Sequence, residues 1–113
     1  MQKGLVVAIS ADTMGSGSEE LGKILLKAFL FSLTELDSPP EALLFFNSGA
    51  LLASNESNTT GDLKTLEEKG VRILICGTCV SYYNLQNKLM AGTVSNMQEI
   101  LQTMANAVKV INI

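Results

Sequence analysis

The sequence predicts an α/β fold, a three-layer α/β/α sandwich around a mainly parallel sheet of about five strands. Short, continuous apolar runs alternate along the chain with longer segments of helical periodicity. Such runs are typical of strands that are covered on both faces of a parallel sheet. The chain has 113 residues, enough for one sizeable core but not for two. Residues 1–113 are therefore expected to form a single domain.

The elements follow one another as right-handed crossovers require. The first strand is expected over residues 5–9, where a β-branched run ends at a polar segment. A helix follows over residues 19–36, with Ser16 and Glu19 as a capping box and a Ser-Pro-Pro segment as its stop. The later elements are strands at residues 42–46, 71–75 and 108–113, a short strand near 90–93, and helices at 62–69 and 95–107, the last capped by Ser95 and Gln98.

The first expected helix is apolar around most of its circumference. Leu21 and Leu25 lie on one part of the apolar arc, and Leu26 and Leu30 extend it on one side. An ordinary surface helix shows an apolar stripe of about 100°. Phe31 falls among the polar residues that remain. One face is expected to pack on the sheet, and another on a neighbouring helix of the domain or on a second subunit. Because large exposed apolar areas usually mark association, we expect a homo-oligomer.

Composition excludes several kinds of site. The chain has no histidine, which excludes a Ser-His-Asp triad, a Cys-His dyad and every metal site that contains histidine. Two cysteines are too few for a four-cysteine zinc site unless two subunits share one ion. We therefore expect no metal and no other cofactor. The net charge of −3 gives no basic surface for nucleic acid or for an anionic membrane.

The expected location is the cytoplasm. The amino-terminal residues do not form a signal peptide, and no apolar run approaches the length of a membrane span. In the cytoplasm thiols stay reduced unless they take part in chemistry.

One glycine-rich segment resembles a phosphate-binding loop. Residues 17–23 match the pattern GxxxxGK after an expected strand. Such a loop needs Ser or Thr next to hold magnesium, whereas Ile24 follows here and two adjacent carboxylates lie inside the loop. We interpret the segment as a glycine turn. Met14, Gly15 and Gly17 remain candidates for lining a site at the strand ends, where open α/β sheets bind ligands.

The two cysteines form a Cys-x-x-Cys segment directly after the strand expected at residues 71–75. Cys76 is placed at the carboxyl end of this strand, and Cys79 lies three residues further on, with Gly77 and Thr78 between them. A thiol at a helix amino terminus meets free amide donors and partial positive charge, which favour the thiolate. The thiolate is the nucleophile for disulfide exchange and for the uptake of sulfane sulfur. The alternative is that Cys76 is a small core residue and the spacing is accidental.

Further polar residues are candidates for the same cleft. Asn47 and Gly49 close another strand, although for Asn47 alone a turn with a left-handed glycine is the preferred explanation. The segment Tyr82-Tyr83-Asn84 and Asn96 are further candidates for the lining.

Several segments, in the same order along the chain, resemble the DsrE superfamily. Within it, the chain is most similar to the DsrE-like domain of the YedF family of sulfurtransferase-like selenium metabolism proteins. The Cys-Gly-Thr-Cys segment together with the later Ser-Asn-Met segment is the most specific part. The segments are residues 5–17, 20–25, 45–49, 76–79 and 92–97.

The resemblance implies a DsrE-like α/β fold, an oligomer, and a cysteine that receives and passes on persulfide sulfur. The family cysteine corresponds to Cys76, while Cys79 has a counterpart in only some branches. Many relatives carry an Arg-Gly pair where this chain has Tyr83 and Asn84. YedF proteins usually carry a TusA-like domain ahead of this one. The chain is then either one domain of such a protein or a protein that meets a TusA-like sulfur carrier in trans.

Three functional hypotheses follow. In the first, the protein handles sulfur or selenium, with Cys76 as the acceptor and Cys79 as the resolving or assisting thiol. In the second, the same pair serves a dithiol oxidoreductase. In the third, the protein is a non-catalytic subunit or binding module, and the cysteines are incidental. The sequence does not distinguish sulfur from selenium, nor does it name a donor or an acceptor.

Overall fold

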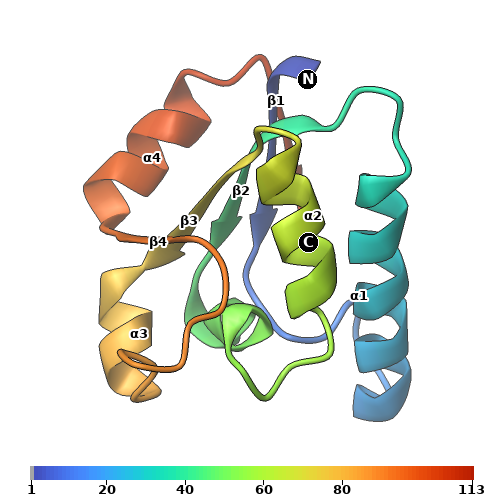
Figure 1. The fold of residues 1–113 in the computed structure, drawn as a ribbon, viewed down its shortest axis with the longest axis vertical. Helices are drawn as coiled ribbons and strands as arrows, with labels where there is room; N and C mark the ends of the chain where they lie inside the picture. The colour runs from blue at the N-terminus through green and yellow to red at the C-terminus, as the bar shows by residue number, and fades with distance from the viewer. Residues whose placement is uncertain (1) are drawn as a thin grey trace.

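The structure, a computed structural model, describes residues 2–113 and contains a five-stranded, wholly parallel sheet (Figure 1). The strand order is β4-β3-β2-β1-β5. Strands β2, β3 and β4 therefore follow one another on one side of β1, and β5 pairs with the other side of β1. The predicted α/β fold class with a parallel sheet is confirmed. The strands are β1 (Gln2–Ile9), β2 (Pro40–Phe45), β3 (Arg72–Cys76), β4 (Thr93–Ser95) and β5 (Lys109–Asn112).

The helices lie between the strands in the expected alternation. Two short elements, η1 and α3, lie at the carboxyl edge of the sheet, where the sequence predicts only turns or the start of a helix. In Figure 1 they lie beside each other at the lower edge, toward which the strands point. The helices are α1 (Glu19–Thr34), the 3-10 helix η1 (Asn47–Ala53), α2 (Thr60–Glu68), α3 (Gly77–Tyr82) and α4 (Met97–Ala105).

Both expected capping boxes were wrong by one or two residues. Ser18, rather than Ser16, caps α1, because its hydroxyl accepts a hydrogen bond from the Leu21 N–H at 3.2 Å. Asn96 caps α4, with its carboxamide oxygen accepting from the Glu99 N–H at 2.8 Å. Ser95 cannot take that role, because it is the last residue of β4. The short strand itself begins at residue 93, later than expected, and pairs with the end of β3.

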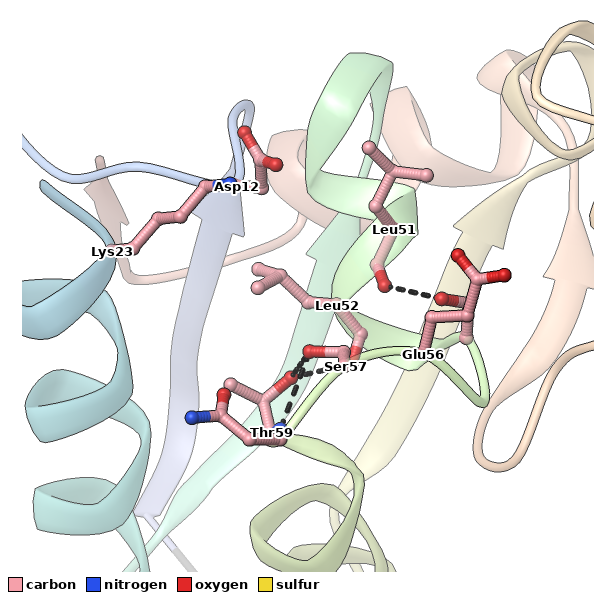
Figure 2. A pocket seen from close by; sticks show the side chains of 9 residues that line it. Asp12, Lys23, Leu51, Leu52, Glu56, Ser57 and Thr59 are labelled. Carbon is pink, nitrogen blue, oxygen red and sulfur yellow. Dashed lines mark hydrogen bonds between the residues drawn. The ribbon is translucent and has the colours of Figure 1, made fainter. Parts of the chain in front are cut away.

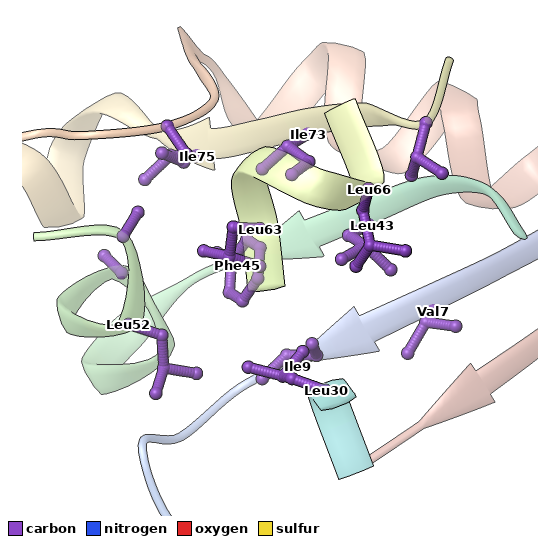
Figure 3. Close-up of a cluster of buried hydrophobic side chains, with 14 of the residues drawn as sticks. Val7, Ile9, Leu30, Leu43, Phe45, Leu52, Leu63, Leu66, Ile73 and Ile75 are labelled. Carbon is purple, nitrogen blue, oxygen red and sulfur yellow. The ribbon is translucent and has the colours of Figure 1, made fainter. Parts of the chain in front are cut away.

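The larger core lies between the sheet and the layer formed by α1, α2 and η1 (Figure 3). It contains the side chains that point to this face from the three central strands, together with the buried leucines of the helices. Its main members are Val7, Ile9, Leu26, Leu30, Leu33, Leu43, Phe45, Leu52, Leu63, Leu66, Ile73 and Ile75.

The opposite face of the sheet carries a smaller core under α4. In Figure 1, α4 lies on one side of the sheet and α1 on the other. Ile100 is the only α4 residue that is buried, and it is fully so. Its cluster includes Cys76. The remaining members of this cluster are Val6, Ala42, Leu44 and Leu74.

The structure confirms that α1 has two apolar faces and shows which of them packs on the sheet. Leu26 and Leu30 are buried against it. Leu21, Ile24 and Phe31 point outward, and Phe31 is 52% exposed. The alternative that the helix of residues 95–107 covers this outer face is wrong, because α4 packs on the opposite side of the sheet. Within residues 2–113, nothing covers it.

Candidate functional site

The site is built where two neighbouring strands end. β2 and β3 pair in parallel, with Phe45 opposite Ile75, so the residues that follow them meet at one edge. Asn47 begins η1 just after β2, and Cys76 is both the last residue of β3 and the N-cap of α3. The topology therefore brings Asn47 and the Cys-x-x-Cys segment together across some thirty residues of sequence, as expected from the strand ends.

Cys76 lies at the boundary between the sheet and α3. Its side chain belongs to the smaller core, and the residue is only 4% exposed. Burial acts to raise the pKa of its thiol, but hydrogen bonds from Cys79 and Thr78, made by their backbone N–H groups and by their side chains, outweigh burial and lower the pKa. The thiolate of Cys76 is therefore stabilised by the first turn of α3.

Cys79 lies one helical turn beyond Cys76 and is half-buried. Its Sγ accepts a hydrogen bond from the backbone N–H of Asn47, at 3.0 Å. Burial and the hydrogen bond with Cys76 raise the pKa of the Cys79 thiol, and the Asn47 N–H opposes them only in part. The two shifts make Cys76 the thiol of the pair that ionises first. Both cysteines are free thiols.

A cleft of about 520 Å³ opens beside Cys79. Its lining is mainly aromatic and apolar, and none of the lining residues is charged. The Tyr83 hydroxyl donates a hydrogen bond to the Asn47 carboxamide oxygen at 3.2 Å. The rings of Tyr82 and Tyr83 meet edge to face, with centroids 5.1 Å apart. The lining residues are Phe46, Asn47, Thr78, Cys79, Tyr82, Tyr83 and Met97.

The structure brings only some of the expected site residues into this cleft. Asn47, Thr78, Cys79, Tyr82 and Tyr83 line it, whereas Asn84 does not. Cys76 does not, so the expectation that its place at the strand end would expose it to the cleft was wrong: its side chain turns into the smaller core instead.

The other expected lining residues have structural roles outside the cleft. Gly77 packs its backbone against β4, where a Cβ would lie 2.8 Å from the Ser95 carbonyl oxygen. Gly49 makes a similar approach to β1. Asn96 caps α4.

The glycine-rich loop before α1 also lies elsewhere than expected. Met14 packs on the larger core. Gly15 and Gly17 are exposed, with positive φ angles and open space around them. None of the three lines the cleft beside Cys79.

Sequence reasoning missed Phe46 and Met97, which complete the wall of the cleft. Phe46 directly precedes Asn47, so the end of β2 could have signalled it. Met97 opens α4 just after β4, and its place became clear only once β4 was known to pair with the end of β3.

A second cavity, of about 490 Å³, lies between the loop after β1 and residues 51–59 (Figure 2). It contains no cysteine. Lys23 lines it together with the carboxylates of Asp12 and Glu56, and pairs with Glu19 at 3.7 Å. Because these carboxylates repel phosphate, the cavity fits the interpretation of the GxxxxGK segment as a glycine turn.

The fold and the paired thiols define an α/β protein with a dithiol at the carboxyl edge of a parallel sheet. The sequence model of the DsrE/DsrF-like family matches residues 7–113, and the chain belongs to this family, whose members are generally related to sulfur relay. No curated protein matches the chain significantly. Among the helices of residues 2–113, none has the length and apolar character needed to cross a membrane.

Two solved structures share the fold over the whole chain. The YchN protein from E. coli superposes with a TM-score of 0.72 at 22% identity, covering 100% of both chains. The MTH1491 protein from Methanobacterium thermoautotrophicum, described as of unknown function, gives a TM-score of 0.71 at 19% identity and covers 99% of this chain and 100% of its own. At this identity, the likeness concerns the fold.

Proposed function

We propose that the protein accepts sulfane sulfur as a persulfide on Cys76 and relays it to an acceptor, with Cys79 as the assisting and resolving thiol. The observation that carries this proposal is the pair of free thiols whose pKa values are shifted in opposite directions, with one of them, Cys79, lining an open cleft. The lowered pKa favours Cys76 as the attacking thiolate, and the raised pKa favours Cys79 as its protonated partner.

The loading step balances without an external oxidant. The Cys76 thiolate attacks the outer sulfur of a donor persulfide, R–S–SH. A new S–S bond forms on Cys76, the S–S bond of the donor breaks, and the donor leaves as a thiolate. An acceptor thiolate then attacks the outer sulfur and restores Cys76. Alternatively, the Cys79 thiolate attacks Cys76 Sγ and releases hydrosulfide, which leaves a Cys76–Cys79 disulfide that a dithiol reductant must reduce.

The cleft gives the route to the thiols. Because Cys76 is only 4% exposed, a donor reaches it past Cys79, which lines the opening with Tyr82 and Met97. The uncharged, aromatic lining favours a donor sulfur carried on a protein segment. We propose a TusA-like carrier protein or domain as the donor or acceptor, in a reducing cytoplasm. Selenium in place of sulfur would follow the same route, since its chemistry at a thiolate is analogous.

Intact-protein mass spectrometry after exposure to a persulfide donor tests this function. The wild type is expected to gain about 32 Da per sulfur atom, an adduct that cyanide removes. Cys76→Ser is expected to abolish the adduct, whereas Cys79→Ser keeps it and loses hydrosulfide release. Labelling that persists in Cys76→Ser and disappears in Cys79→Ser would reverse the two roles. The absence of any adduct on either thiol would refute sulfur relay.

A dithiol oxidoreductase is the second candidate, favoured by two adjacent free thiols whose pKa values are shifted in opposite directions. It predicts a reversible Cys76–Cys79 disulfide with a measurable reduction potential, and no cyanide-labile sulfur. A non-catalytic subunit is the third candidate. It predicts that Cys76→Ser changes none of these measurements.

We also propose that the protein is a homo-oligomer that associates through the outer face of α1. Leu21, Ile24 and Phe31 are more than half exposed on this face, and an apolar patch of this kind usually marks an interface. Phe31→Glu is expected to shift the mass seen by light scattering toward the monomer, because burying an unpaired carboxylate is costly. Leu101→Glu, at an exposed position of α4, is the matched control. A wild type that is monomeric at all concentrations would contradict the proposal.

A further inference from the structure

The corner between β2 and η1 has an unusual backbone. Asn47 has a φ of 52°, in the left-handed region that residues other than glycine rarely adopt, although asparagine tolerates it better than most. This conformation lets the chain turn sharply into η1 while the peptide N–H of Asn47 points to Cys79 Sγ, 3.0 Å away. A strained position next to the thiols suggests that the direction of this N–H matters.

Other contacts hold this corner in place. The Gly49 N–H donates to the Phe46 carbonyl oxygen at 3.1 Å and closes the turn. Gly49 itself packs so tightly that a Cβ would lie 2.3 Å from the Ile9 carbonyl oxygen. The Tyr83 hydroxyl donates to the Asn47 carboxamide at 3.2 Å. Asn47 is therefore bonded to α3 twice, at Cys79 in its first turn and at its C-cap, Tyr83.

The hydrogen bond from the Asn47 N–H limits the directions in which the Cys79 S–H can point. A sulfur that accepts a hydrogen bond on one side directs its S–H to another acceptor. Cys76 is the N-cap of α3 and Cys79 lies in its first turn, so the Cys76 thiolate is an acceptor within the same turn, and such a bond lowers the pKa of Cys76. Donors in such a series polarise one another, which strengthens the bond to the thiolate. The groups around Cys79 that titrate are Cys76, Tyr82 and Tyr83; the lining of the cleft includes no charged side chain.

We propose that Asn47 is a positioning residue of the dithiol: its N–H, held by the corner and by Tyr83, orients Cys79 so that the Cys79 thiol donates to the Cys76 thiolate. Asn47 thus acts on Cys76 through Cys79 and does not itself react. The inference deepens the proposed function, since it concerns the same two thiols. Its test needs no sulfur donor, so its failure and the failure of sulfur relay are distinguishable.

The test is a double-mutant cycle on the alkylation rate of Cys76, measured by peptide mass spectrometry across pH. Tyr83→Phe and Asn47→Gly both remove the bond between the two side chains, while glycine keeps the left-handed backbone easily. Each is expected to raise the pH midpoint of Cys76 alkylation and to slow the reaction roughly threefold at neutral pH. Asn84→Gly is the matched control, because Asn84 also has a positive φ, 57°, and does not line the cleft, and it is expected to leave the rate unchanged.

The Cys79→Ala background separates positioning from general loosening of the fold. In that background, Tyr83→Phe and Asn47→Gly are expected to have no further effect on the alkylation rate of Cys76, because the Cys79 thiol through which Asn47 acts is absent. An equal slowing in both backgrounds would overturn the proposal, and so would unchanged rates in the wild-type background.

A second measurement requires no substitution at the corner. The backbone amide resonance of Asn47 is expected to move with pH as the dithiol titrates, and to stop moving in Cys79→Ala. An Asn47 amide that is insensitive to pH in the wild type would overturn the proposal even if the corner variants failed to fold.

Discussion

Replacing Gly49 with alanine is expected to destabilise the protein strongly, although it adds a single methyl group. The new Cβ would lie 2.3 Å from the Ile9 carbonyl oxygen, 3.1 Å from its carbonyl carbon and 3.4 Å from the Ala11 nitrogen. All three are backbone atoms at the end of β1, so no side chain can rotate away. Gly49 does not have a left-handed φ. Steric contact, rather than backbone strain, is therefore the cause of the destabilisation.

The magnitude follows from the rigidity of both partners. Overpacking a core typically costs about 1–3 kcal/mol, and a clash between two backbones belongs at the upper end of this range. A loss of about 2.5 kcal/mol corresponds to a fall in Tm of roughly 10 °C for a domain of this size. Because Gly49 closes the corner that contains Asn47, the alkylation of Cys76 is expected to shift to higher pH in the same variant.

Urea unfolding measures the effect, and Gly61→Ala is its control. Gly61 lies in α2 with open space around its missing Cβ, so alanine is expected to stabilise by about 0.5 kcal/mol. The reasoning would be refuted if Gly49→Ala unfolded at the urea concentration of the wild type, or if both substitutions changed stability in the same direction.

Three further outcomes are expected. Iodoacetamide reacts with Cys76 at lower pH than with Cys79, because the pKa of Cys76 is lowered and that of Cys79 is raised; peptide mapping checks this. Because folding lowers the pKa of Cys76, its ionisation stabilises the folded protein. This contribution grows as pH rises from the folded pKa toward the usual thiol value of about 8.5, and it is lost as pH falls through the folded pKa. Urea unfolding of Cys76→Ser at several pH values checks this. Leu30→Ala, at a fully buried position, costs about 3 kcal/mol, whereas Leu101→Ala, at a position 59% exposed, changes the free energy of unfolding by less than about 0.5 kcal/mol.

The sheet could be predicted from the sequence because each buried strand is a continuous apolar run. The side chains of β1, β2 and β3 are buried on both faces, and that environment requires such runs. The orientation of α1 could not be predicted, because leucines occupy both of its faces and periodicity alone does not rank them. The bounds of β4 could not be predicted either, because an edge strand of three residues is too short to show a hydrophobic pattern in the sequence.

Part of the candidate site was predictable for a topological reason. Residues that follow adjacent parallel strands meet at one edge, which places Asn47 beside the cysteines. The relative exposure of Cys76 and Cys79 was not predictable, because it depends on how α3 turns away from β3. The loop of Gly15 and Gly17 was expected in the cleft only because it also follows a strand; the order of the strands places it elsewhere.

The shallow attachment of α4 has a consequence for motion. A single fully buried side chain, Ile100, anchors this helix over the cluster that contains Cys76, whereas the opposite layer holds many leucines. Segments with few buried contacts open at free energies well below that of global unfolding. Detachment of α4 would uncover Cys76 while the rest of the sheet stayed folded. The rate at which bulky reagents react with Cys76 would then depend on the opening of α4 alone. Amide hydrogen exchange in residues 97–105 would depend on the same opening.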